Sequence, residues 1–217
     1  RGRIIYGMGE RPIVELAKRI EQGESITDIK DIPQTVFFSE DNPAEEDIVL
    51  HSFEDCLKNK KLQSLNFRHI EEESNKYHGN VIWQKTGNRI IRINPMYPPM
   101  TPQEMDASFD LPYTRMPHPR YRGKHIPAYD MIRHSVNMHR GCFGGCAFCT
   151  ISAHQGKFIA SRSKDSIMRE VRQVCAMPDF KGYISDLGGP SANMYAMGGI
   201  NKDICKKCVR PSCLHPK

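Results

Sequence analysis

Three cysteines stand close together in a glycine-bearing stretch of the chain. Cys142, Cys146 and Cys149 follow the spacing C-x3-C-x2-C. Thiols so spaced hold iron, hold zinc, or remain reduced structural cysteines. Zinc usually takes four protein ligands, and a self-contained four-iron cluster takes four cysteines. Because this loop supplies three, an iron–sulfur cubane bound here would keep one iron open, and an open iron allows chemistry on a bound molecule.

The wider motif, C-x3-C-x-F-C with Phe148 before the last cysteine, resembles the signature of the radical S-adenosylmethionine (SAM) enzymes. The resemblance implies that the three cysteines hold a 4Fe-4S cluster whose open iron binds SAM. One electron from the cluster would then cleave SAM to a 5′-deoxyadenosyl radical. The resemblance also places the backbone of Phe148 near the adenine. Gly144 and Gly145 allow the loop backbone to wrap closely around the sulfurs.

A glycine pair, Gly188 and Gly189, follows the second strand that we expect in the carboxyl-terminal part. In the radical SAM superfamily such a pair, often followed by Glu, binds the amino group of SAM. The resemblance therefore implies backbone contact between this pair and SAM. Pro190 stands where Glu is common, which restricts the implied role to the backbone. A plain tight turn is the alternative interpretation.

The resemblance extends over much of the chain. The runs HRGCFGGCAFC, HQGKFIASRS and SDLGGPSANMYAMG, together with the amino-terminal YGMGERPIVELA, resemble the YgiQ-type radical SAM proteins. This implies SAM as a bound partner and a reductant such as flavodoxin or ferredoxin. It implies no particular substrate, and RNA is only a weak candidate.

A second cysteine cluster lies near the end of the sequence. Cys205, Cys208 and Cys213 follow the spacing C-x2-C-x4-C. They predict an auxiliary iron–sulfur cluster or a zinc site, with a fourth ligand from beyond Lys217, from elsewhere, or from substrate. Reduced cysteines in a basic terminus are the alternative. Cys56 and Cys175 are isolated on predicted apolar helix faces, where we expect them to be buried.

Composition limits the classes of protein. The 217 residues carry a net charge of +6 with both signs interspersed, which suggests an anionic partner without identifying one. No apolar run approaches the roughly 18 residues of a membrane span, so no membrane partner is expected. Clustered cysteines without a signal peptide indicate metal and a reducing, cytoplasmic location. The chain begins at Arg1 and ends beside cysteines, so we interpret it as an internal fragment.

The expected organisation has three parts. Residues 1–23 read as a strand, a glycine turn and a helix, similar to the last βα unit of an upstream doubly wound, cobalamin-binding-like domain. They lack a cobalamin-ligating histidine motif, so that cofactor is not inferred. Residues 24–130 read as a linker, a helix over 49–78, a β-hairpin over 81–93 and a short helix whose capping box begins at Thr101.

Residues 131–217 read as the truncated start of a radical SAM (β/α) barrel. A strand over 132–140 would deliver the cysteine loop, followed by a helix over 161–177 with Ser163 as its N-cap and a strand over 182–187. The expected fold class is therefore α/β. A partial barrel follows the tail of a doubly wound domain and an irregular α+β middle.

The resemblance thus implies that the parent protein is a radical SAM iron–sulfur oxidoreductase-like enzyme that abstracts hydrogen from an unknown substrate. The fragment by itself is expected to be inactive. Two alternatives stay open at this point: an iron–sulfur electron-transfer protein, and a zinc-stabilised RNA-binding module.

Overall fold

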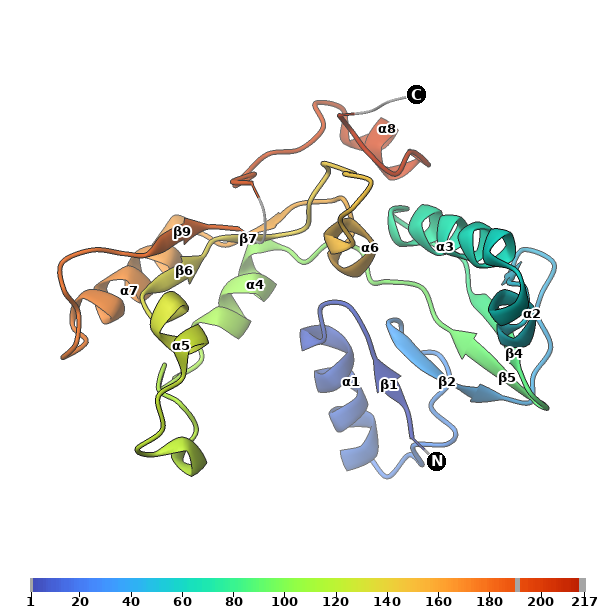
Figure 1. The fold of residues 1–217 in the computed structure, drawn as a ribbon, viewed down its shortest axis with the longest axis horizontal. Helices are drawn as coiled ribbons and strands as arrows, with labels where there is room; N and C mark the ends of the chain where they lie inside the picture. The colour runs from blue at the N-terminus through green and yellow to red at the C-terminus, as the bar shows by residue number, and fades with distance from the viewer. Residues whose placement is uncertain (1, 190–191, 215–217) are drawn as a thin grey trace. The chain divides into compact units, whose positions relative to one another are not determined.

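The computed structural model describes residues 2–189 and 192–214. Its contacts divide the chain into two compact units, both visible in Figure 1. Unit 1 comprises Arg1–Pro99, Cys142–Phe158 and Gly199–Lys217, and unit 2 comprises Met100–Gly141 and Ile159–Gly198. This division does not test the domain boundaries expected from the sequence, which remain predictions.

Unit 1 is built on one five-stranded sheet. The strand order is β1-β2-β5-β4-β3, and only the β3–β4 pair is parallel. The strands are β1 (Ile4–Ile5), β2 (Thr35–Ser39), β3 (Ile48–Val49), β4 (Ile82–Thr86) and β5 (Arg89–Ile93). The β4–β5 pair confirms the predicted hairpin. Its turn contains Gly87 at φ +61°, a backbone conformation that favours glycine.

Strand β2 corrects the expectation of a linker over residues 24–48, because it lies between β1 and β5 in the sheet. Its alternate residues Thr35, Phe37 and Ser39 are buried. Side chains alternate between the two faces of a strand, so this face is buried although two of its three members are polar. The polar members hide the apolar alternation that would have revealed the strand.

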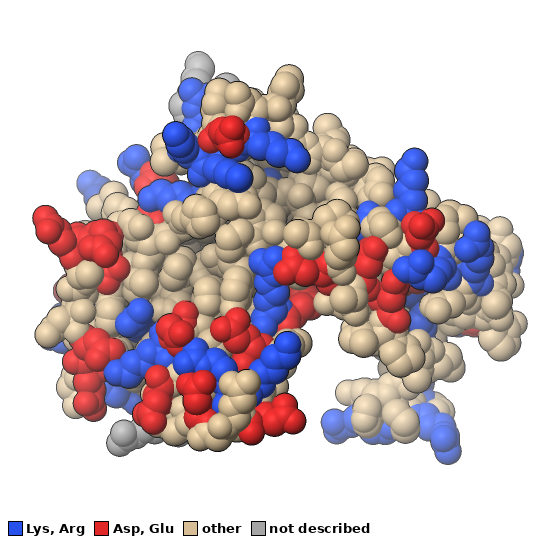
Figure 2. Space-filling model, turned by 180° about the vertical axis from the view of Figure 1, so that it is seen from behind, with Lys and Arg blue, Asp and Glu red and all other residues tan. Residues whose placement is uncertain are grey.

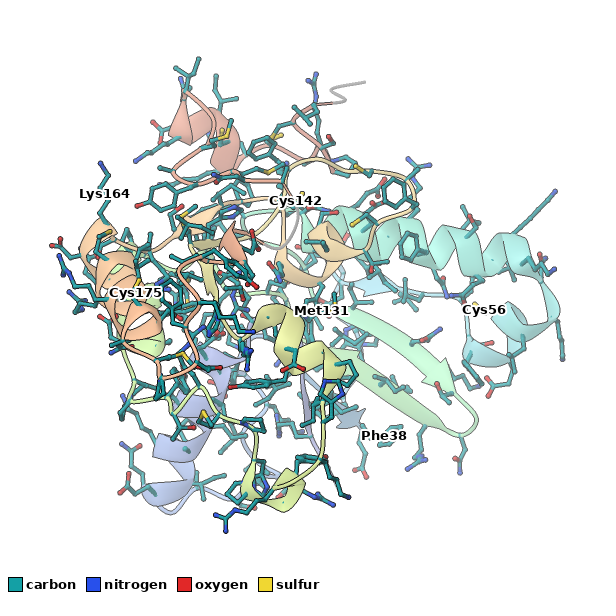
Figure 3. The ribbon with its side chains drawn as sticks, turned by 60° about the vertical axis from the view of Figure 1, so that its left-hand side comes forward. Phe38, Cys56, Met131, Cys142, Lys164 and Cys175 are labelled. Atoms are coloured by element: carbon teal, nitrogen blue, oxygen red, sulfur yellow. The ribbon has the colours of Figure 1, made fainter. Side chains whose placement is uncertain are left out.

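The helices of unit 1 are α1 (Glu10–Glu21), α2 (Phe53–Lys58), α3 (Lys60–Ser74), α6 (Ile151–Gln155) and α8 (Lys202–Lys206). The single helix predicted over 49–78 is divided at Asn59, whose backbone is extended and whose side chain accepts the Lys61 N–H. Cys56, labelled in Figure 3, lies on α2 and is buried as predicted. Its sulfur accepts a hydrogen bond from Asn66 Nδ2 at 3.0 Å.

The described part of unit 2 contains short strands and four helical segments. The strands are β6 (Ser135–Asn137), β7 (His139–Arg140), β8 (Ala160–Ser161) and β9 (Asp186–Gly188). The helical segments are α4 (Pro102–Phe109), a 3-10 turn (Pro119–Tyr121), α5 (Pro127–Ile132) and α7 (Lys164–Cys175). Strands β6 and β9 pair in parallel, whereas β7 and β8 are antiparallel. Val136, Met138, Ile167 and Val174 form the core of this unit.

The predicted barrel is confirmed only as a mixed α/β arrangement. The described sheets do not form a closed barrel, although β6, α7 and β9 form one parallel βαβ connection. The strand predicted over 132–140 is shorter, because Ile132 ends α5 and Met138 separates β6 from β7. The strand predicted over 182–187 begins only at Asp186.

Local helix signals were predicted correctly. The capping box of Thr101 and Glu104 is present, and the Ser163 hydroxyl accepts the Ser166 N–H at the start of α7. The prediction that Cys175 is buried was wrong, because this thiol at the end of α7 is exposed (Figure 3). Val174 is the buried residue there, and adjacent helix positions point about 100° apart.

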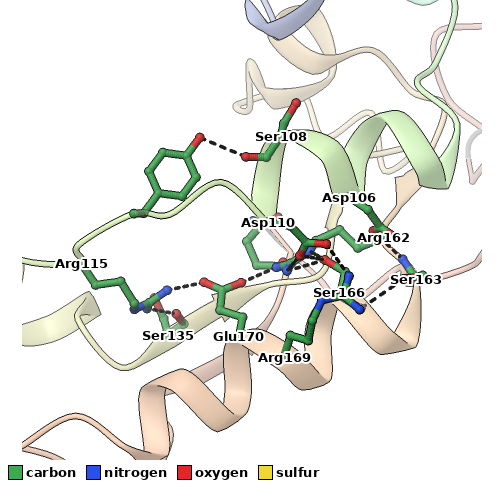
Figure 4. Close-up of polar contacts among 12 residues, drawn as sticks. Asp106, Ser108, Asp110, Arg115, Ser135, Arg162, Ser163, Ser166, Arg169 and Glu170 are labelled. Carbon is green, nitrogen blue, oxygen red and sulfur yellow. Dashed lines mark hydrogen bonds and ion pairs between the residues drawn. The ribbon is translucent and has the colours of Figure 1, made fainter.

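A network of ion pairs joins the segments of unit 2 (Figure 4). Glu170 on α7 pairs with both Arg115 and Arg162. The wholly buried guanidinium of Arg162 also donates to the Asn137 carbonyl at 2.8 Å. Asp110 accepts hydrogen bonds from Ser166 and from the more exposed Arg169. The network thereby fixes α7 to β6 and to the chain that follows α4.

Among the described residues, no helix has the length and apolar character needed to cross a bilayer.

Candidate metal centre

The first cysteine cluster lies on a loop of unit 1, in the segment between β7 and α6. The Cys142 N–H donates to the Gly156 carbonyl at 3.1 Å, which ties the start of the loop to the end of α6. The Cys149 N–H donates to the Cys146 carbonyl at 3.0 Å and closes a turn. Gly145 adopts φ +59°, which a residue with a side chain rarely adopts.

Gly144 leaves space between two of the three sulfurs. A Cβ atom at this position would lie 3.4 Å from Cys142 Sγ and 3.7 Å from Cys146 Sγ. Those two thiols therefore border one common space, which a larger residue would fill. Cys142 is buried, Cys146 is exposed and Cys149 is half-buried. The Phe148 side chain is 91% exposed, so it packs little against the unit and only its backbone is fixed by the turn.

The donor set fits a thiolate-bound metal or cluster, because three cysteines share a short loop whose glycine leaves room beside the sulfurs. In residues 2–189 and 192–214, however, no three His, Cys, Asp or Glu side chains are placed to hold one metal ion. The structure thus brings Cys142 and Cys146 to a shared space without completing the trio with Cys149. The assignment of these ligands remains a proposal.

The second cysteine cluster is attached to this same loop. The Ser212 hydroxyl shares its one proton between the carbonyls of Phe143 at 3.1 Å and Gly144 at 3.0 Å. The Cys213 N–H donates to the Phe143 carbonyl at 3.2 Å. A Cβ on Gly145 would lie 2.4 Å from Ser212 Cβ, so only glycine permits this approach. The two cysteine segments are therefore structural neighbours within unit 1.

Lys157 connects the end of the loop segment to the second cluster. Its side chain is buried, with only 2% of the residue exposed, and Nζ donates to the carbonyls of Cys208 and Arg210. Nζ also lies 3.3 Å from Cys208 Sγ. Burial alone would raise the pKa of the Cys208 thiol. Hydrogen bonds from the Arg210 backbone and from Lys157 outweigh this effect of burial, so the pKa of Cys208 lies below its ordinary value.

The glycine pair lies in unit 2, where His139 supports it. His139 is fully buried, and its Nε2 accepts the Met194 N–H at 3.0 Å. A Cβ on Gly189 would lie 2.0 Å from that Nε2, so the backbone of Gly189 rests directly on the imidazole. Burial lowers the pKa of His139 below its ordinary value, which favours the neutral ring that can accept at Nε2. Pro190 lies outside the described residues.

The comparison with known protein families decides the family. The family model described as Radical SAM N-terminal matches residues 2–135, more than half of this chain. The chain belongs to the radical SAM N-terminal family. The resemblance inferred from the cysteine loop and its flanking runs is thereby confirmed, although the loop itself lies beyond the matched residues.

Curated relatives of this radical SAM family chain are UPF0313 proteins. The protein from Bacteroides thetaiotaomicron is 60% identical over 228 residues, which cover 99% of this chain and 37% of that protein. The Porphyromonas gingivalis protein is 57% identical, covering 98% of this chain and 34% of that protein. UPF0313 protein YgiQ from Escherichia coli K12 is 36% identical, and the match covers 98% of this chain and 36% of that protein. The chain therefore spans about a third of the length of these relatives. No solved structure matches it.

Three residues important to the geometry of this radical SAM family chain were missed by sequence reasoning. Lys157, Ser212 and His139 each act through a partner roughly fifty residues or more away in the sequence. No local pattern marks them. Figure 2 shows basic and acidic side chains next to one another at the lower left and at the right of this face, whereas the lower-right projection carries basic side chains without acidic neighbours.

Proposed function

We propose that this chain supplies the cluster-binding loop of an enzyme that reductively cleaves SAM. The observation that carries the proposal is the C-x3-C-x-F-C loop in a chain of the radical SAM N-terminal family, with Gly144 leaving a space shared by the sulfurs of Cys142 and Cys146. Family membership supports an enzyme-like parent protein, and the loop is where its chemistry would begin.

The chain's own residues have separate roles in this proposal. Cys142, Cys146 and Cys149 provide three thiolates, and Gly144 keeps the space beside two of them free. When bound, a 4Fe-4S cluster with one open iron would supply the electron for the reductive cleavage of SAM. The loop must position the cofactor and exclude water and oxygen.

The other proposed contacts with SAM are made by backbone. The turn closed between Cys146 and Cys149 fixes the peptide groups of Phe148 beside the thiols, and these would meet the adenine. Taken by itself, unit 2 offers the backbone of Gly188 and Gly189, and Gly189 lies against the His139 ring. We propose that this backbone contacts the amino group of SAM. We also propose a flavodoxin-like or ferredoxin-like protein as the reductant. The free cysteines favour a reducing compartment such as the cytoplasm. No substrate is proposed.

The test uses the whole protein, reconstituted anaerobically with iron and sulfide and then reduced with dithionite in the presence of SAM. We expect 5′-deoxyadenosine in a chromatographic assay and its loss in Cys142→Ser, Cys146→Ser and Cys149→Ser. Cys175→Ser is the matched control, because this thiol is exposed on α7 and should leave the product unchanged. An intact cluster that yields no 5′-deoxyadenosine would contradict the proposal.

An electron-transfer protein gives a different result in the same samples. Its cluster would show no change in the electron paramagnetic resonance spectrum on addition of SAM, since no iron would be open to it. We expect a change in the wild-type spectrum.

A further inference from the structure

The second cysteine cluster sits on an ordered segment of unit 1. Asn201 caps the first turn of α8 by accepting the N–H groups of Asp203 and Ile204. The Cys208 N–H then donates to the Cys205 carbonyl at 3.1 Å, so that these two cysteines share one turn. A Cβ on Gly199 would lie 2.0 Å from Cys205 Sγ, which shows how closely the backbone packs on this sulfur.

The segment is held in place at both of its later cysteines. The Cys213 N–H donates to the Phe143 carbonyl. The hydroxyl of the neighbouring Ser212 lies within hydrogen-bond distance of the Phe143 and Gly144 carbonyls. Cys208 is anchored by Lys157 Nζ through its carbonyl and its sulfur. Both later cysteines of the segment are therefore fixed by contacts with other residues of unit 1.

Lys157 presents an unusual charge balance. Burying an ammonium costs free energy unless hydrogen bonds and an opposite charge compensate for it. Among the residues that the structure describes, its hydrogen-bond partners are two carbonyls and the Cys208 sulfur, with no carboxylate. Among these partners, the Cys208 sulfur is the one that can carry a negative charge.

We propose that Cys205, Cys208 and Cys213 are the ligands of a second metal site, separate from the Cys142 loop, that takes zinc or the iron of an auxiliary cluster. Three thiolates around a divalent ion leave one surplus negative charge, which Lys157 neutralises. An N–H donor to a ligand sulfur is the outer-shell contact that such sites use. In the described residues the three thiols are not yet arranged around one point, so binding must rotate their side chains.

Metal content tests this site independently of SAM cleavage. The whole protein is prepared with all three loop cysteines changed (Cys142→Ser, Cys146→Ser, Cys149→Ser), and zinc, iron and acid-labile sulfide are measured. We expect about one metal site per chain to remain, as zinc without sulfide or as iron with it. Adding Cys205→Ser and Cys213→Ser should remove that metal, whereas adding Cys175→Ser should not. Metal lost with the loop variants alone, or kept after the tail variants, would overturn the proposal.

A second measurement needs no cysteine variant and so avoids any folding defect. Thiol alkylation of the wild-type protein, mapped by mass spectrometry, should label Cys205, Cys208 and Cys213 much faster after a chelator has removed metal. Equal rates with and without chelator would contradict the site.

Lys157 is assigned a positioning role, which a charge-removing variant tests. Lys157→Met should weaken metal retention against a competing chelator by about 10- to 100-fold. Lys164→Met is the matched control, because Lys164 is exposed at the start of α7 (Figure 3). Wild-type protein that holds this metal but does not cleave SAM would count against the proposed function alone. Wild-type protein that cleaves SAM but lacks this metal would count against this site alone.

Discussion

Gly189 lies directly against the imidazole of His139, so closely that a Cβ on Gly189 would be 2.0 Å from Nε2 and 2.2 Å from Cε1. The ring cannot move away easily, because it is fully buried and its Nε2 holds the Met194 N–H. The neighbouring Gly188 is less constrained, since a Cβ there would be 3.4 Å from the Asp186 Oδ1 atom. The two glycines of the pair therefore have different reasons to be glycine.

Gly189→Ala should destabilise unit 2 by about 2–3 kcal/mol, because the added methyl overlaps a buried ring that has no free space to enter. Gly188→Ala, the matched control, should cost less than about 1 kcal/mol. Urea unfolding followed by circular dichroism measures both. Equal losses for the two variants would show that the close contact with His139 is not what constrains Gly189.

The pH dependence of stability should contain a contribution from His139. Its pKa is lowered by burial, so the folded state binds the proton less tightly than the unfolded state. The free energy of unfolding should therefore fall as the pH drops from about 7 towards 5, through the ordinary histidine pKa and then the folded one. His139→Gln keeps an acceptor for Met194 without this titration, and its thermal midpoint should fall less over the same range. An unchanged slope would contradict the assignment.

Glu170 should be a major stabilising residue of unit 2, because it pairs with both Arg115 and the wholly buried Arg162. Glu170→Gln leaves Arg162 without its closest charge partner and should cost about 3 kcal/mol in denaturant unfolding. Arg169→Gln is the comparison, since Arg169 is half-exposed and its pair with Asp110 should contribute less than about 1 kcal/mol. A smaller loss for Glu170→Gln than for Arg169→Gln would refute this ranking.

Gly144→Ala should separate cluster binding from folding. The new methyl group would enter the space that Cys142 Sγ and Cys146 Sγ share, with contacts of 3.4 Å and 3.7 Å that the metal-free loop tolerates. Iron bound after anaerobic reconstitution should therefore fall severalfold, while the thermal midpoint of the metal-free protein stays within about 2 °C. Gly198→Ala, where a Cβ meets nothing within 4 Å, should change neither quantity. Full iron loading of Gly144→Ala would show that this space is not used.

Short-range signals predicted the local structure well. The capping box at Thr101, the cap at Ser163 and the hairpin around Gly87 all depend on residues within a few positions of one another. Such motifs satisfy backbone groups locally, so the sequence alone contains the whole interaction. The cysteine loop belongs to the same class, because its spacing is itself the signal.

Long-range pairing explains what sequence reasoning missed. Strand β2 forms by pairing with β1 and β5, and these two strands lie at opposite ends of the first segment of unit 1. The burial of Arg162 depends on the Asn137 carbonyl and on Glu170, and no pattern around Arg162 indicates those partners. Lys157 likewise meets Cys208 across about fifty residues. Propensity and periodicity carry no information about contacts at that separation.

Unit 1 is discontinuous in the chain, and this determines the order in which it can be completed during translation. The ribosome delivers the five-stranded sheet first, the cysteine loop second and residues 199–214 last, after all of unit 2. Until that final stretch emerges, the carbonyls of Phe143 and Gly144 lack the Ser212 hydroxyl and Lys157 lacks Cys208 and Arg210. The nascent loop therefore acquires its contacts with Ser212 and Cys213 only after residues 199–214 have been synthesised.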